Sequence, residues 1–211
     1  MSHDHYPDHP HEPLAAHEPP AGARARALEA LLVDKGVIDR DDVRSRIDWL
    51  VSRSPADGAR LVARAWVDPA FKQRLLADAR EAALELGLDP GPSPVVVALE
   101  NTDTVHHVVV CTLCSCYPKA LLGPPPDWYK SLVYRSRVVA DPRGVLGEFG
   151  LPLDDEIEVR VVDSTADVRY LVIPSRPHGA EALSEEELAA LVTRDSMIGV
   201  SRAAPPFEFE S

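Results

Sequence analysis

The stretch LDPGPSP, residues 88–94, separates two parts of the chain that differ in apolar period. Before it, apolar residues such as Leu28 and Leu31 recur at the spacing of an amphipathic helix. After it, the β-branched runs at residues 95–99 and 105–110 are typical of strands. The proline and glycine content of the stretch itself is that of a linker. We therefore expect an α+β protein, in which an extended helical arm is followed by an α/β-layered domain.

This division predicts three segments. Residues 1–22 form a tail rich in His, Pro, Asp and Glu, which is typical of a disordered segment; a weak metal-collecting tract is the alternative. Residues 23–90 form the arm, whose narrow apolar stripes would be buried on another chain as readily as on this one. Residues 91–211 form the C-terminal domain. The tail histidines are His3, His5, His9, His11 and His17.

Local signals predict the main helices and strands. Asp39 or Asp41 would cap the second helix, and the last helix of the arm would span residues 71–86. Beyond the linker, helices are expected at residues 128–139, 142–149 and 184–194. The last of these opens with a capping box. Two further runs, at residues 157–162 and 168–173, are expected to be strands that pair with each other.

The formal net charge of −12 at pH 7 argues against nucleic acid or a membrane surface as a partner, since both require a concentrated basic face. No apolar run approaches the ~20 residues that a membrane-spanning helix requires. The N-terminus lacks the basic and apolar regions of a signal peptide. A cytoplasmic location is therefore expected, where ordinary thiols stay reduced. An odd number of cysteines, three, also argues against a disulfide framework.

All three cysteines lie within six residues, in the sequence CTLCSC, directly after a predicted strand. We call residues 111–116 the cysteine loop. If the amide nitrogens of Ser115 and Cys116 lose their protons, they form a planar four-donor strip with the sulfurs of Cys114 and Cys116. Cys111 then supplies an axial thiolate, and the sixth octahedral position stays open, as in catalytic metal sites. Because an amide is a very weak acid, trivalent cobalt or iron fits this donor set better than zinc.

Other uses of these thiols compete with this one. A structural zinc site would need a fourth ligand, which His106 or His107 could provide, but such sites usually combine separated pairs of ligands. Cys111 and Cys114 have the spacing of a redox pair, although no helix signal follows and Cys116 would be left over. Inert buried cysteines are common, yet three in one turn are not typical of them. A catalytic metal centre is the favoured interpretation.

Four blocks of the sequence resemble one protein family. They read LENTDTVHHVVVCTLCSCYP, LLGPPPDWYKSLVYRSRVVADPRGVL, RYLVIPSRP and LVTRDSMIGV. Within the first block, VCTLCSCYP resembles the signature of the α subunit of nitrile hydratases and of the related catalytic subunit of thiocyanate hydrolase. The resemblance implies that residues 91–211 form a metal-binding catalytic domain and that the helical part corresponds to the extended arm of that family.

The resemblance also implies the state of the metal and its ligands. The metal would be one non-corrinoid cobalt(III) per chain, because cobalt members of the family carry Thr at the position of Thr112 and iron members carry Ser; iron(III) is the alternative. Cys111 would stay a thiolate, Cys114 would become a sulfinate and Cys116 a sulfenate. The amides of Ser115 and Cys116 would be the other ligands. Oxidation at these sulfurs is chemically reasonable, since metal-bound thiolates are electron-rich.

The implied reaction is the hydration of a nitrile to its amide, with the metal as Lewis acid. The sulfenate oxygen of Cys116, beside Cys114 and Ser115, would be the nucleophile or the base that activates water. The implied partner is a β subunit of one or two chains, in an assembly such as α2β2, whose arginines hold the oxidised sulfurs. A metallochaperone or activator would supply the cobalt. Hydrolysis of thiocyanate or carbonyl sulfide at the same centre is the rival enzymatic function, and a metal carrier is the alternative outside enzymology.

Residues outside the cysteine loop are expected to support it. His106 and His107 are neighbours on a predicted strand, so at most one of them would face the metal. A core histidine with satisfied hydrogen bonds is the alternative for either. Tyr129 and Arg135, together with Arg137, would line or brace the pocket, or else serve packing and surface charge.

Departures from the usual sequence of this family bear on the substrate. Lys119 and Ala120 stand where many members have Trp-Pro, which changes the channel wall nearest the metal. Residues 176–179 read RPHG rather than the commoner RPAG, and Val162 stands where Trp is frequent. We therefore expect a bulky heteroaromatic nitrile to be a better substrate than a small aliphatic one.

Overall fold

The computed structural model describes residues 20–206 and divides the chain into two compact units, Met1–Ile47 and Asp48–Ser211. The described part of the first unit holds helix α1 (Pro20–Asp34) and most of α2 (Arg40–Val51). Asp39 caps α2, since its Oδ1 accepts a hydrogen bond from the backbone N–H of Asp41 at 2.7 Å. The tail predicted for residues 1–22 lies outside the described residues, except that α1 already begins at Pro20.

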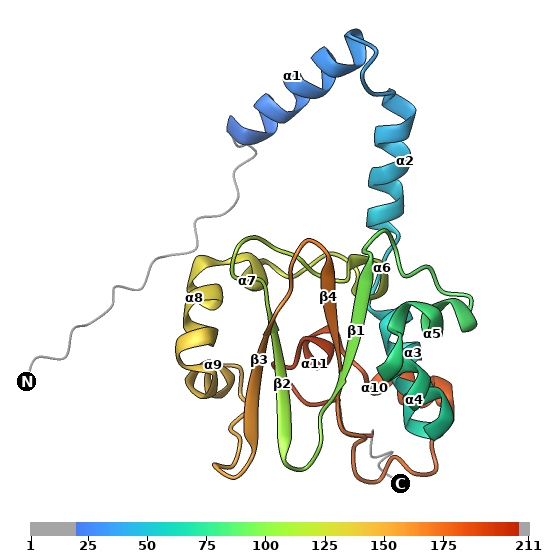
Figure 1. Ribbon diagram of the computed structural model, residues 1–211, viewed down its shortest axis with the longest axis vertical. Coiled ribbons are helices and arrows are strands. Elements are labelled where there is room, and N and C mark those ends of the chain that lie inside the picture. The colour runs from blue at the N-terminus through green and yellow to red at the C-terminus, as the bar shows by residue number, and fades with distance from the viewer. Residues whose placement is uncertain (1–19, 207–211) are drawn as a thin grey trace, which may run out of the picture. The chain divides into compact units, whose positions relative to one another are not determined.

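Four strands of the second unit form two parallel pairs. They are β1 (Val95–Glu100), β2 (Val105–Val110), β3 (Glu158–Asp163) and β4 (Val168–Ile173). β1 pairs with β4 in the register Val95↔Val168, and β2 pairs with β3 in the register Val105↔Glu158. Figure 1 shows the two pairs next to one another, with α3–α5 on the side of β1 and α8 and α9 on the side of β3. The expected mixture of helices and strands is confirmed.

The expected pairing of residues 157–162 with residues 168–173 is wrong. The short connection between them favours a hairpin, but the chain crosses instead from one strand pair to the other, and Val168 begins beside Val95. β2 is buried along its whole length after Val105. Its backbone groups therefore need a strand partner rather than water, and β3 provides that partner.

Helices α3 (Ala56–Val67), α4 (Pro69–Ala77) and α5 (Ala79–Glu85) belong to the second unit rather than to an arm. Leu61, Phe71 and Leu75 are fully buried in the same hydrophobic core as the strands. The boundary between the units thus lies after residue 47, not near residue 90. α3 buries six residues, a broader face than the narrow stripe expected from the sequence, and that face finds its partners within this chain.

The single helix expected at residues 71–86 is broken at Asp78. This residue has an extended backbone, and its carboxylate accepts hydrogen bonds from the N–H groups of Arg80 and Glu81. In the same way Ser131 separates α7 (Asp127–Lys130) from α8 (Leu132–Ala140), which it caps. In both places a short polar side chain that caps a new helix interrupts a continuous apolar period.

The remaining helices lie after the cysteine loop. They are α6 (Lys119–Leu122), α9 (Pro142–Glu148), α10 (Glu185–Leu191) and α11 (Arg194–Ile198). Ser184 and Glu187 form the predicted capping box of α10. α11 ends at Gly199, which has a φ of 90° and lies so close to the carbonyl oxygen of His107 that a Cβ would overlap it. β2 and the end of α11 are therefore packed backbone against backbone.

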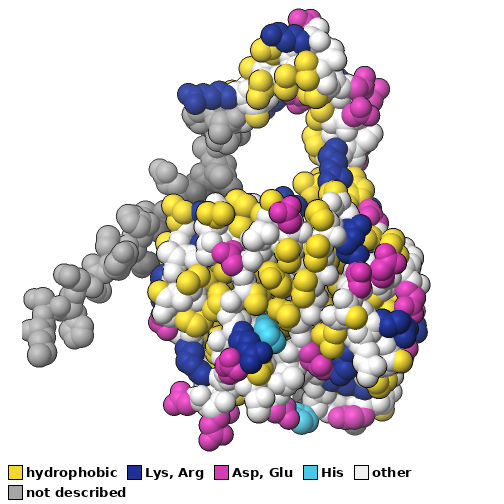
Figure 2. All heavy atoms as spheres, viewed as in Figure 1, with side chains coloured by type: hydrophobic (Ala, Val, Ile, Leu, Met, Phe, Trp, Pro, Cys, Tyr) yellow, Lys and Arg dark blue, Asp and Glu magenta, His cyan; other side chains and the backbone are white. Residues whose placement is uncertain are grey.

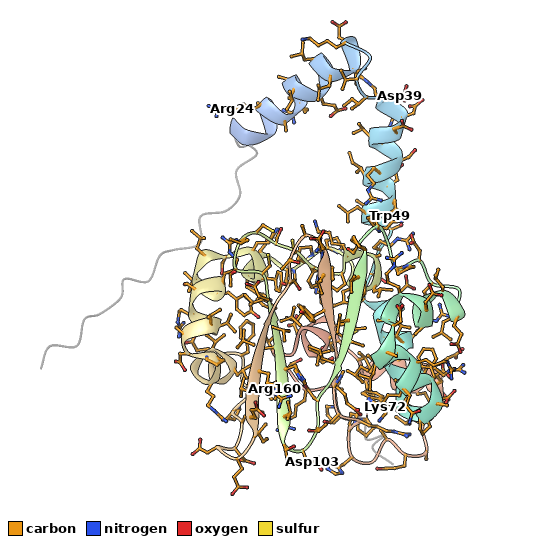
Figure 3. The ribbon with its side chains drawn as sticks, in the orientation of Figure 1. Arg24, Asp39, Trp49, Lys72, Asp103 and Arg160 are labelled. Atoms are coloured by element: carbon orange, nitrogen blue, oxygen red, sulfur yellow. The ribbon has the colours of Figure 1, made fainter. Side chains whose placement is uncertain are left out.

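The cysteine loop lies at the carboxyl end of β2. Figure 3 labels Asp103, in the turn that leads into the other end of this strand, and Arg160, on the neighbouring β3. Figure 2 shows apolar side chains gathered over the strands of this unit on the viewed face. None of the described helices combines the length and apolar character that crossing a bilayer requires.

Candidate metal centre

The first turn of the cysteine loop is held by the end of β3. Because β2 and β3 are parallel and in register, Val110 lies opposite Asp163. The two carboxylate oxygens of Asp163 accept hydrogen bonds from the Thr112 backbone N–H at 2.9 Å and from the Thr112 hydroxyl at 2.5 Å. The Ser164 N–H donates to Val110 O at 2.7 Å. The strand pairing thus fixes where the loop begins.

The three thiols of the loop face one another. The Cys114 sulfur lies 3.3 Å from that of Cys111 and 3.1 Å from that of Cys116, and all three sulfurs lie within 4.8 Å of one another. Cys111 is buried, Cys116 is half-buried and Cys114 is exposed. The group therefore has a closed side toward β2 and a side open to solvent. Such an arrangement can hold a metal ion and leave a coordination position accessible.

Hydrogen bonds within the loop make one sulfur a ready ligand. Hydrogen bonds from Cys116 and Cys111 lower the pKa of the Cys114 thiol to about 7. The backbone N–H groups of Ser115 and Cys116 make smaller contributions in the same direction. Burial, together with the hydrogen bond to Cys114, raises the pKa of Cys116 to about 12. A thiolate is thus favoured at Cys114. The proposed nitrogen donors are the backbone nitrogens of Ser115 and Cys116, in the segment that joins Cys114 to Cys116.

Two of the expected supporting residues contact the loop directly. The Tyr129 hydroxyl donates to Cys116 O at 2.9 Å, and Arg135 Nη1 donates to Cys114 O at 2.8 Å. Tyr134, which sequence reasoning missed, donates from its hydroxyl to Val109 O at 2.8 Å, just before the loop. Asp163 was missed as well. An acidic residue that ends an apolar strand is a signal for such a cap, but its partner depends on the strand pairing.

Arg137 does not take part. Its guanidinium forms an ion pair with Glu148, with Nη2 at 2.5 Å from Oε1.

The two histidines are not brought to the thiols. Both are buried. His106 is hydrogen-bonded through Nδ1 to the Asn101 amide and through Nε2 to Gly199 O. His107 is hydrogen-bonded through Nδ1 to Asn101 Oδ1. Burial lowers the pKa of both histidines. Within residues 20–206, the group of side chains able to hold a metal is made of the cysteines alone. His106 and His107 therefore do not complete a zinc site, and their contacts are those of core histidines.

A family model for the nitrile hydratase alpha chain matches residues 20–201 of this sequence. The chain belongs to the nitrile hydratase alpha-chain family. The low-molecular weight cobalt-containing nitrile hydratase subunit alpha of Rhodococcus rhodochrous is 52% identical over 204 residues, covering 92% of this chain and 99% of that one. The gamma subunit of thiocyanate hydrolase from Thiobacillus thioparus is 42% identical, covering 85% of this chain and 78% of that one.

Solved structures agree with this membership of the nitrile hydratase family. A double mutant of the Fe-type nitrile hydratase from Comamonas testosteroni Ni1 matches with a TM-score of 0.81 and 42% identity, covering 90% of this chain and 98% of that one. The resemblance drawn from the four sequence blocks is thus confirmed.

The departures from the usual nitrile hydratase sequence lie in different places. Lys119 and Ala120 begin α6, directly after the loop, and a Cβ on Gly91 would lie 2.7 Å from that of Ala120, so the chain is tightly packed here. Arg176 and His178 instead line a cavity of about 650 Å³ near Asp103, at the opposite end of β2. The RPHG departure is therefore remote from the thiols. Because Ala120 is buried in this packing, the case for an altered substrate rests on Lys119.

Proposed function

We propose that this chain is the catalytic α subunit of a nitrile hydratase, which adds water to a nitrile and forms the amide. The observation that carries the proposal is the gathering of the Cys111, Cys114 and Cys116 sulfurs within 4.8 Å of one another. The proposed ion is low-spin, non-corrinoid cobalt(III), bound by Cys111, Cys114, Ser115 and Cys116. Relatives named as cobalt-containing support cobalt, and the Fe-type neighbour keeps iron as the alternative.

Within this proposal each residue of the loop has its own task. The ion would supply Lewis acidity toward the nitrile or water. Cys114 and Cys116, the more exposed thiols, are the ones proposed to be oxidised, to a sulfinate and a sulfenate; Cys111 is buried and stays a thiolate. The oxygen on Cys116 would accept a proton from water or attack the substrate carbon. Tyr129 and Arg135 hold the loop carbonyls in place while this happens.

The proposed partner is a β subunit, in an α2β2 or similar assembly. Large apolar side chains are exposed in the loop and on α8: Leu113 is 89% exposed, and Leu132 and Val133 on α8 are 73% and 63% exposed. Arg135, on the same helix, donates to Cys114 O, so α8 itself is in contact with the loop. Exposed apolar groups of this size are typical of a surface that another chain covers. A cobalt-delivering activator and a cytoplasmic location remain predictions from the sequence.

We further propose a bulky heteroaromatic nitrile as substrate, because Lys119, half-buried directly after the loop, stands where many members of the family have a bulkier Trp. The second candidate reaction is hydrolysis of thiocyanate or carbonyl sulfide, which the 42% identity to a thiocyanate hydrolase subunit favours. Steady-state rates with a cyanopyridine, acrylonitrile and thiocyanate separate these possibilities. Faster turnover of acrylonitrile than of the cyanopyridine would argue against the bulky substrate, and turnover of thiocyanate alone would replace the hydratase.

The decisive experiment is metal analysis of the chain purified with its partner subunit from cobalt-supplied cells. We expect about one cobalt per chain that resists chelator, since low-spin cobalt(III) exchanges slowly, and mass spectrometry should find two added oxygens on Cys114 and one on Cys116. The triple variant with Ser at Cys111, Cys114 and Cys116 is the matched control and should retain none. Zinc, or cobalt that washes out, would contradict the proposal and favour a metal carrier.

A further inference from the structure

Arg135 acts on a particular peptide group of the cysteine loop. Its Nη1 donates to Cys114 O at 2.8 Å. The carbonyl of Cys114 and the nitrogen of Ser115 belong to the same peptide unit, whose electrons are shared between oxygen and nitrogen. A positive charge held at that oxygen is therefore felt at the Ser115 nitrogen.

The charge of Arg135 is not neutralised within the described chain. Its Nε is buried without a hydrogen-bond partner, and no carboxylate of residues 20–206 forms an ion pair with its guanidinium. Arg137, on the same helix, provides the contrast, because its guanidinium is paired with Glu148. The loop thus receives an unpaired guanidinium, aimed at one carbonyl oxygen, and such charge-assisted hydrogen bonds are about twice as strong as neutral ones.

We propose that Arg135 is a positioning residue that turns the Cys114–Ser115 peptide into a metal ligand. Binding through nitrogen requires the N–H bond of Ser115 to break; the proton leaves to water, and the electron pair that stays on nitrogen forms the bond to the metal. The negative charge spreads to Cys114 O, where the guanidinium of Arg135 stabilises it. The inference deepens the proposed function, because it presupposes Ser115 N as a ligand.

The structure supplies a control for a purely mechanical role. Tyr129 makes a similar contact to Cys116 O, at 2.9 Å, but the nitrogen of that peptide unit belongs to Tyr117, which is not a proposed ligand. If Arg135 only braced the loop, removing it would loosen the loop as removal of the Tyr129 hydroxyl would. If Arg135 stabilises negative charge on the peptide, removing it should instead make the Ser115 N–H harder to deprotonate.

Hydrogen exchange in the metal-free, full-length chain distinguishes the two roles. Base-catalysed exchange of an amide passes through the same negatively charged peptide, so a nearby cation accelerates it. We expect Arg135→Gln to slow exchange at the Ser115 amide by about ten- to a hundredfold, the factor that corresponds to a hydrogen bond to a charged group. Arg137→Gln and Tyr129→Phe should not slow it. Exchange at Ser115 that is unchanged or faster in Arg135→Gln would overturn the proposal, since loosening alone accelerates exchange.

A second pair of variants keeps the test decisive if Arg135→Gln misfolds. Arg135→Lys and Arg135→Met have side chains of similar length and differ in charge, so the lysine variant must exchange faster at Ser115 and take up cobalt faster. Equal rates in the two variants would refute a role for the charge. Failure of the wild-type complex to retain cobalt would instead refute the proposed function, while the exchange data would still decide what Arg135 does.

Discussion

Tyr129→Phe tests how strongly the protein core holds the cysteine loop. The ring of Tyr129 is fully buried and packs edge-on against Tyr117 at 5.2 Å and Trp128 at 6.0 Å, contacts that phenylalanine keeps. The substitution removes one atom, the hydroxyl oxygen that donates to Cys116 O at 2.9 Å. It is therefore a nearly pure test of one hydrogen bond between the core and the loop.

The magnitude follows from the burial of both partners. Leaving a buried acceptor unpaired costs about 1–3 kcal/mol. Because Cys116 is only half-buried, water can partly replace the lost donor, and we expect the lower part of this range, about 1–2 kcal/mol. In a chain of this size that corresponds to a fall in Tm of about 2–8 °C.

Urea denaturation of the full-length chain measures this change, with Tyr170→Phe as the control. Tyr170 is half-buried on β4, and its hydroxyl has no hydrogen bond to any described residue, so we expect a change below about 0.5 kcal/mol. Equal effects of the two substitutions would refute the reasoning, because the bond to Cys116 O would then contribute nothing measurable. A loss above about 4 kcal/mol would also refute it, since a single hydrogen bond does not account for so much.

Further predictions concern the residues around the loop and behind β2. Asp163→Asn should weaken the hydrogen bonds to Thr112. Amide exchange at Thr112 should then rise about tenfold, and the cobalt content of the purified complex should fall. Unchanged exchange would contradict the role of the carboxylate. Gly199→Ala should abolish soluble expression or lower the Tm by several degrees, since a Cβ would overlap the His107 carbonyl oxygen; a stable variant would argue against that packing. Burial lowers the pKa of His106 and His107 below 6.5, so the unfolded chain binds protons that the folded chain does not. Stability is then complete above pH 6.5 and declines as pH falls below it; the double variant with Gln at both positions should lose less stability between pH 7.5 and 5 than the wild type.

Much of the local structure could be predicted because its causes are local. The strands at residues 105–110 and 168–173 were bounded correctly from their β-branched runs. Ser184 and Glu187, three residues apart, form a capping box that predicted where α10 begins. The cysteine loop could be predicted as a candidate metal centre because its three thiols lie in six consecutive residues, and the structure brings their sulfurs within 4.8 Å of one another.

The helix interrupted at Asp78 shows where local reasoning was insufficient. Its apolar period runs through the break. The sequence does not show whether the helix continues through Asp78 or whether Asp78 ends it and caps a new helix. In the structure the carboxylate of Asp78 caps α5, and the helices on both sides of the break, α4 and α5, pack against β1.

The sequence by itself determined the family, the segment that holds the candidate metal centre and the mixed helix and strand composition, since each depends on residues close together in the chain. Only the tertiary structure decided that β3 pairs with β2, which places Asp163 against Thr112 at a separation of 51 residues. It also decided that Arg135, and not either histidine, reaches the loop. The physical reason is that these contacts depend on which buried strands satisfy each other's backbone groups, a competition among segments that no local pattern records.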